Sequence, residues 1–152
     1  MLGLERRTST VQHTITEEMV GLFGQLSGDL NPLHFDNEFA ERTRFGGRIV
    51  HGMLYTSFVS EALYKLGLSD ECVIFGDLYV RFIEAVRIGD TITARATMIG
   101  MDKIMHVVEC ELTNQKNEIV SRCKTKVLIE KLKEKKAKLQ VVAQTDAAEQ
   151  VA

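Results

Sequence analysis

The chain has no tryptophan, one proline (Pro32) and no long apolar run. No stretch approaches the roughly 18 apolar residues that a membrane-spanning helix needs, and residues 1–14 lack the apolar core of a signal peptide. The three cysteines, Cys72, Cys110 and Cys123, lie far apart without CxxC spacing, so neither a disulfide framework nor a metal site is indicated. We therefore expect a cytoplasmic protein without a metal, although a removed organelle-targeting peptide would leave no trace.

The chain also lacks an excess of charge of either sign. Its 19 Lys and Arg and 21 Asp and Glu give a formal net charge of −2. This balance gives no electrostatic reason to expect a nucleic acid or an acidic membrane as partner. A length of 152 residues and a hydrophobic content of 45% are typical of one globular domain with a single core.

One helix with a wide apolar face is expected in residues 53–66. Gly67 is its expected C-terminal cap, and Gly52, where the first turn begins, lets the backbone come close to whatever lies in front of the helix. Shorter helices are expected in 17–26 and 37–43. The main helix is indicated by apolar side chains with the spacing i, i+3, i+4, i+7, namely Tyr55, Phe58, Val59, Ala62, Leu63 and Leu66.

After this helix the apolar pattern changes from a period of 3.6 to a period of 2. In residues 91–98, Ile and Ala alternate with Thr and Arg, which is typical of a strand with one face in water. An apolar helix can be buried beside such strands only if their sheet curls around it, so we predict an α+β protein with a single hot-dog fold. The expected antiparallel strands are 10–16, 77–82, 91–98, 107–113 and 119–129.

The composition changes at residue 130. We therefore expect a domain formed by residues 1–129, followed by a tail of residues 130–152. Residues 130–152 contain five lysines and two glutamates in their first nine positions, and then mostly small and amide residues. This pattern predicts a charged, partly disordered tail. A basic patch that recruits a partner is the alternative interpretation.

The segment SGDLNPLHFD, residues 27–36, concentrates polar side chains around the proline. Proline disfavours a helical backbone at Asn31, so the expected turn brings Asp29 and His34 toward one point, supported by Asn31 and Asp36. A carboxylate and a neutral imidazole can together hold a water and transfer its parts. The alternative is a purely structural turn in which these side chains cap backbone groups.

A second segment, FGGRIVHGM at 45–53, places glycines before a helix start. Free backbone N–H groups and the helix dipole at such a start can polarise a carbonyl oxygen. Within it, His51 is expected to be a cap or a spacer bonded to the backbone. The two segments together indicate water chemistry beside a carbonyl group.

Residues 27–53 resemble the signature of the MaoC-like, R-specific enoyl-CoA hydratase family. That signature runs S-G-D-x-N-P-x-H-x-D, then F-A, then T-x-F, and ends in I-x-H-G-M, and this chain matches it almost residue for residue. One departure is Ala85-Val86, where many relatives have Pro-Val. The long tail is a second departure.

The resemblance implies a hot-dog homodimer with Asp29 and His34 as catalytic pair. The N–H of Gly52 would bind the thioester oxygen, and Ser60 would lie near the active site. The implied reaction is reversible syn addition of water to a trans-2-enoyl thioester, which gives the R-3-hydroxyacyl thioester. CoA or an acyl-carrier phosphopantetheine is then part of the substrate, and no further cofactor is needed.

Two other functions remain open at this point. An acyl-CoA thioesterase of the same fold would also use a carboxylate, a water and a helix start. A non-catalytic module that binds acyl thioesters, such as a ligand-sensing domain, would need neither catalytic side chain. Arginine suits phosphate geometry, so the candidate contacts to the CoA phosphates are Arg44, Arg48, Arg81 and Arg87.

Overall fold

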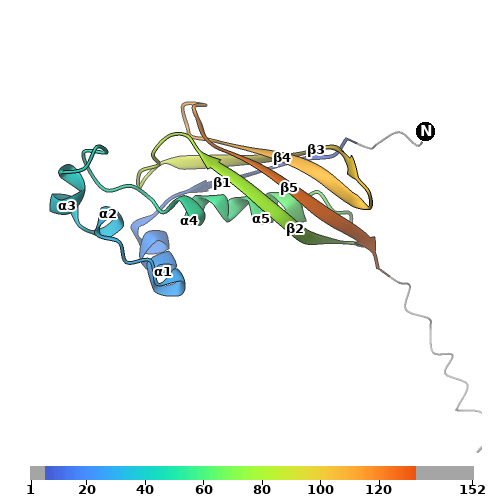
Figure 1. Cartoon of the computed structure of the whole chain (residues 1–152), viewed down its shortest axis with the longest axis horizontal. Coiled ribbons are helices and arrows are strands. Elements are labelled where there is room, and N and C mark those ends of the chain that lie inside the picture. Colours follow the sequence, from blue (N-terminus) through green and yellow to red (C-terminus); the bar gives the residue numbers. More distant parts are fainter. Residues whose placement is uncertain (1–5, 133–152) are drawn as a thin grey trace, which may run out of the picture.

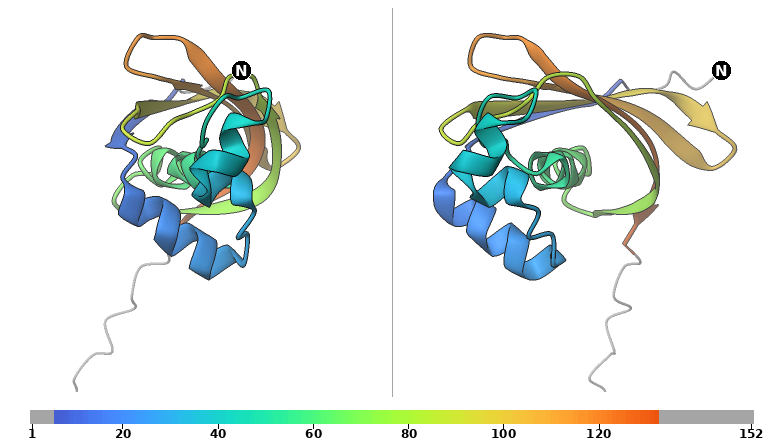
Figure 2. Two further views of the ribbon diagram at one scale, coloured as in Figure 1. Left: turned by 90° about the vertical axis from the view of Figure 1, so that its left-hand side faces the viewer. Right: turned by 60° about the vertical axis from the view of Figure 1, so that its left-hand side comes forward.

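A computed structural model describes residues 6–132, in which an antiparallel sheet curls around a helical segment (Figures 1 and 2). All five expected strands are present, and the helices expected in 17–26 and 37–43 are present as well. The elements in chain order are β1 (Thr8–Thr14), α1 (Glu17–Ser27), α2 (Pro32–Phe35), α3 (Asn37–Glu41), α4 (Gly52–Thr56), α5 (Phe58–Tyr64), β2 (Glu71–Phe82), β3 (Thr91–Asp102), β4 (Met105–Thr113) and β5 (Ile119–Lys131).

The sheet has the order β1-β3-β4-β5-β2, and every neighbouring pair is antiparallel. The register shifts between Phe75 and Asp77 in β2 and between Met98 and Gly100 in β3. Such bulges bend a strand and increase its twist, and Figure 2 shows the sheet bending around α4 and α5. The predicted α+β hot-dog arrangement is thereby confirmed.

The core lies between this sheet and the segment formed by α4 and α5. Along β3 and β4 every second side chain is buried, as the alternating pattern predicts. Apolar side chains of the helices and of the sheet fill this core together. The helices contribute Tyr55, Phe58, Val59, Ala62 and Leu63, and the strands contribute Ile92, Ala94, Met98, Val108, Leu112, Val120 and Val127.

The prediction of one continuous helix over 53–66 is wrong in detail, because the helix is interrupted at Ser57. The hydroxyls of Thr56 and Ser57 donate to carbonyls one turn earlier, at 2.8 and 2.6 Å, and such bonds compete with the helical pattern. Ser57 keeps helical dihedral angles, with φ −60° and ψ −22°, so α5 continues in line with α4. The expected cap at Gly67 is also wrong, since α5 is capped by Lys65 and Gly67 lacks a positive φ.

Helices α1, α2 and α3 form a group beyond the N-terminal end of α4 (Figure 1). Residues 32–35, expected as a turn, form the one-turn helix α2, because Pro32 at its first position suits a helix start and Asn31 caps it. Strand β5 extends to Lys131, past the expected boundary at 129, and the rest of the predicted tail from 133 lies outside the described residues. Within residues 6–132 no helix has the length and apolarity to cross a membrane.

Candidate active site

The SGDLNPLHFD segment is shaped by local caps. Helix α1 ends at Gly28, whose φ of 75° is left-handed and whose N–H donates to the Gly24 carbonyl at 2.9 Å; glycine takes this conformation without steric cost. The Asn31 side chain accepts the Leu33 N–H at 3.1 Å and so caps α2. Asp36 in the same way accepts the Phe39 N–H at 3.0 Å and caps α3.

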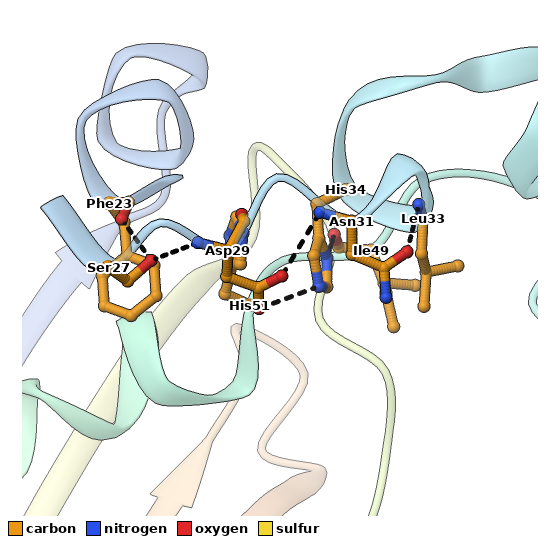
Figure 3. Close-up of polar contacts among 8 residues, drawn as sticks. All are labelled: Phe23, Ser27, Asp29, Asn31, Leu33, His34, Ile49 and His51. Atoms are coloured by element: carbon orange, nitrogen blue, oxygen red, sulfur yellow. Dashed lines mark hydrogen bonds and ion pairs between the residues drawn. The ribbon is translucent and has the colours of Figure 1, made fainter. Parts of the chain in front are cut away.

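The segment before α4 holds this turn by three hydrogen bonds that involve side chains and by a backbone bond from the Ile49 N–H to the Leu33 carbonyl at 3.4 Å. Figure 3 draws Ile49 and His51 beside the turn. Arg48 Nε donates to the His34 carbonyl at 2.7 Å, and the Ile49 carbonyl lies 2.8 Å from His34 Nδ1. His51 Nε2 lies 2.9 Å from the carbonyl oxygen of Asp29. The two sequence segments that carry the family resemblance therefore meet in space.

Asp29 and His34, the predicted pair, face each other with His34 Nε2 4.0 Å from Asp29 Oδ2 (Figure 3). The Ile49 carbonyl can only accept, so the His34 hydrogen lies on Nδ1 and the Nε2 lone pair faces Asp29. Burial lowers the pKa of His34, and His51 adds to this, whereas the bond to Ile49 and the Asp29 carboxylate act the other way. The 4.0 Å separation is compatible with a water that bonds both groups at about 2.8 Å.

Gly52 and His34 line the same cavity, which has a volume of about 260 Å³ and also contacts Tyr55, Phe82 and Val86. As the first residue of α4, Gly52 has an N–H without an intrahelical acceptor. A Cβ at this position would lie 2.7 Å from the Phe82 ring. The Phe82 ring thus comes close to the backbone at Gly52, as the expected use of glycine at this position allows. Binding of a thioester oxygen by the Gly52 N–H stays a prediction.

Ser60 is not brought to this cavity. It is exposed on α5, two turns beyond Gly52, and does not belong to the residues that line the cavity with His34. Asp29 also lies outside the cavity lining, with half of its side chain exposed. A role of Ser60 near the active site stays a prediction.

The four candidate arginines lie in three different places. Arg48 donates to the His34 carbonyl and pairs with Glu17, and Arg87 donates to the carbonyls of Phe45 and Arg48, so both stabilise the 45–50 loop. Arg44 lines the cavity, with its guanidinium 4.8 Å from the centre of the Phe45 ring. Arg81 belongs instead to a larger hollow of about 480 Å³ among charged side chains of the sheet.

Of the two roles expected for His51, the cap is wrong, and the residue bonded to the backbone is confirmed by the bond to the Asp29 carbonyl. Its side chain makes no capping bond to α4 but contacts both predicted catalytic residues. Asp29, His34 and His51 bring their possible metal-ligand atoms within 4.8 Å of one another, and within residues 6–132 no other group of His, Cys, Asp and Glu does so. The two imidazoles are stacked, 3.8 Å apart and inclined by 31°, so their in-plane lone pairs do not converge on one ion, and the residues fit a metal poorly.

A model of the MaoC like domain matches residues 4–120 of the chain. The (R)-specific enoyl-CoA hydratase of Rhodospirillum rubrum is 38% identical over 97 residues, which are 64% of this chain and 67% of that protein. The 3-hydroxybutyryl-CoA dehydratase of Methylorubrum extorquens is 34% identical over 88 residues, 58% of this chain and 55% of that protein. The chain thus spans between about half and two thirds of these relatives.

The fold is similar to that of a solved hydratase. The structure of the (R)-hydratase from A. caviae involved in PHA biosynthesis superposes with a TM-score of 0.74 at 26% identity. The superposition covers 84% of this chain and 98% of that one. The overall fold of this chain therefore has a counterpart in a solved structure.

Proposed function

This chain belongs to the MaoC-like domain family, and from that membership we propose that it catalyses the reversible hydration of trans-2-enoyl thioesters. The product is the R-3-hydroxyacyl thioester, and the thiol part of the substrate is CoA or a carrier-bound phosphopantetheine. The observation that carries the proposal is the facing pair Asp29 and His34, 4.0 Å apart, beside a cavity that the N–H end of α4 enters.

In the proposed mechanism Asp29 and His34 hold one water between them. The neutral His34 presents its Nε2 lone pair, and its lowered pKa keeps it in this form near neutral pH. As the water oxygen bonds to C3, one of its protons passes through the pair to C2 on the same face of the double bond. The elements of one water are thus added, and both side chains return to their starting protonation states.

The thioester oxygen gains negative charge as the water adds to C3. The N–H of Gly52, which has no acceptor within its helix, is proposed to bind this oxygen. A well-aligned donor of this type often contributes about 3 to 4 kcal/mol to transition-state stabilisation. A side chain on residue 52 would collide with the Phe82 ring, so glycine leaves the start of α4 open to the cavity that both residues line.

The test is the loss of ultraviolet absorbance of crotonyl-CoA, a four-carbon enoyl thioester, with chiral analysis of the product. We expect the R-3-hydroxy product, and we expect Asp29→Asn and His34→Gln to lower kcat by about 10²- to 10⁴-fold, the usual contribution of a general acid or base. Asp70→Asn, on the exposed loop before β2, is the matched control. Release of free CoA without hydration would favour a thioesterase, and binding without turnover would favour a non-catalytic module.

We further propose that the chain forms a homodimer through the edge strand β2. This strand has 12 residues and stands at one end of the sheet order, so among residues 6–132 only β5 pairs with it. A long apolar edge strand pairs readily with another strand, whereas the opposite edge, β1, has the mostly polar sequence TSTVQHT. The large apolar side chains that β2 exposes are Ile74, Phe75, Leu78, Tyr79 and Phe82.

Light scattering after size-exclusion chromatography measures the oligomeric state directly. We expect the mass of a dimer for the wild-type chain and a shift toward the monomer for Tyr79→Lys, because Tyr79 is 69% exposed on β2. Gln12→Lys places the same charge on the exposed part of the other edge, β1, and should leave the dimer intact. A monomeric wild-type chain at micromolar concentration would reject the proposal.

A further inference from the structure

His51 is buried in a way that its position before α4 does not explain. Its side chain is 1% exposed and makes no capping bond to the helix. The His34 ring lies 3.8 Å away, and the rings of Phe23 and Phe35 lie at 5.0 and 5.5 Å. An apolar ring would fill this aromatic enclosure equally well, so the function of the two ring nitrogens has to be found in their contacts.

The two nitrogens of His51 have different environments. Nε2 lies 2.9 Å from the Asp29 carbonyl oxygen, which can only accept, so Nε2 carries the hydrogen. Nδ1 is buried and has no hydrogen-bond partner among residues 6–132. A proton on Nδ1 would be a buried charge without an acceptor, so the geometry fits a neutral imidazole whose one donor is used on Asp29.

Asp29 depends on this donor more than His34 depends on any single contact. The other hydrogen bonds of Asp29 are local. Its N–H donates to Ser27 Oγ at 3.2 Å, and its Oδ1 accepts from the Asn31 N–H at 3.3 Å. Its side chain is 50% exposed, so packing does not fix it. Within the described residues, His51 gives the one hydrogen bond to Asp29 that comes from outside 27–31.

His34, in contrast, is held from two sides. The Ile49 carbonyl accepts from its ring, and Arg48 donates to its carbonyl. Three hydrogen bonds that involve side chains therefore connect residues 48–51 to Asp29 and His34 and set the separation of the two. Of these three bonds, only the one from His51 acts on Asp29.

We infer that His51 is a positioning residue of the active site: it holds Asp29 at the separation from His34 that one water spans, and its ring fixes the plane of the His34 ring. The inference rests on the proposed hydration for its kinetic consequence, and His51 itself contacts no reacting atom. The contacts of Nε2–H and of the ring face are separable by substitution.

The substitution His51→Phe keeps the stacked ring and removes the donor to Asp29. A residue that only fills this space would be replaced by phenylalanine without loss, whereas a residue that donates to the Asp29 carbonyl would not. An amide N–H at the same position should then restore part of the lost activity.

The experiment compares three variants with the wild-type chain on crotonyl-CoA. We expect His51→Phe to lower kcat by about 10- to 100-fold, the usual effect of losing a contact that orients a catalytic group, with KM changed by less than about threefold. His51→Gln, which retains an N–H donor, should recover part of kcat. His106→Phe is the matched control, because His106 on β4 also has a buried Nδ1 without a partner among the described residues.

A second measurement does not depend on turnover. Nitrogen NMR of the imidazoles reports the tautomer of each histidine, and we expect His51 in the Nε2–H form and His34 in the Nδ1–H form. Wild-type kcat in folded His51→Phe, or His51 in the Nδ1–H form in the wild-type chain, would overturn the inference. If the wild-type chain did not hydrate crotonyl-CoA but the NMR result held, the proposed function would fail and the positioning role would stand.

Discussion

Gly52→Ala tests the candidate site with a single added methyl group. The new Cβ would lie 2.7 Å from two carbons of the Phe82 ring, whereas carbon atoms in contact are normally about 3.5 to 4.0 Å apart. The ring must therefore move by about 1 Å. Phe82 is 49% exposed in the single chain, so its ring can shift at low cost, and we expect a small loss of stability, about 1 kcal/mol.

The expected loss of activity is larger than the loss of stability. Phe82 and Gly52 line the cavity together, so both the new methyl group and the displaced ring occupy space that the thioester needs. A displacement of about 1 Å in a reacting group costs about 10²-fold in rate, which is about 2.7 kcal/mol of activation free energy. We expect this fall in kcat/KM for crotonyl-CoA.

Two further variants separate crowding from other causes. Gly21→Ala adds the same methyl group in α1, where it meets no atom within 4 Å, and should leave kcat/KM unchanged with a slightly higher Tm, because alanine favours a helix. Gly52→Ala combined with Phe82→Leu should recover activity by restoring space. Wild-type kcat/KM in Gly52→Ala alone would refute the close approach of substrate to the start of α4.

Two other predictions follow from the protonation of buried groups. Because burial lowers the pKa of His34, the acidic limb of kcat/KM should lie below pH 6.5, the ordinary histidine value. The unfolded chain then binds a proton that the folded chain rejects, so the contribution of His34 to stability is constant above about pH 6.5 and falls as the pH drops toward its folded pKa. Chemical denaturation across this range checks the sign. Burial also raises the pKa of Cys110 to about 12, and Cys123 is buried beside it whereas Cys72 is exposed, so a thiol reagent should modify one thiol quickly in the native chain and three after denaturation.

Local patterns in the sequence were sufficient to predict most of the elements. Alternation with period 2 predicted four of the five strands, because it depends only on which side chains face the core, and the strand at 10–16 was expected in addition. The same reasoning failed at Ser57, where hydroxyls one residue apart bond back to the helix, and at Gly67, which the chain does not use as a left-handed cap. In both places the deciding contact is a hydrogen bond, which leaves no apolar period.

The sequence by itself determined the residue types of the candidate site and the turn that brings Asp29 near His34, because that turn is local and Pro32 restricts it. Only the tertiary structure decided how the site is held. Residues 48–51 fix the His34 tautomer through Ile49 and hold Asp29 through His51, from 15 and 22 residues away. Contacts over such separations depend on how the sheet curls around α4 and α5, and no local pattern encodes them. For the same reason Ser60, which matches the family along the sequence, lies exposed outside the cavity that His34 and Gly52 share.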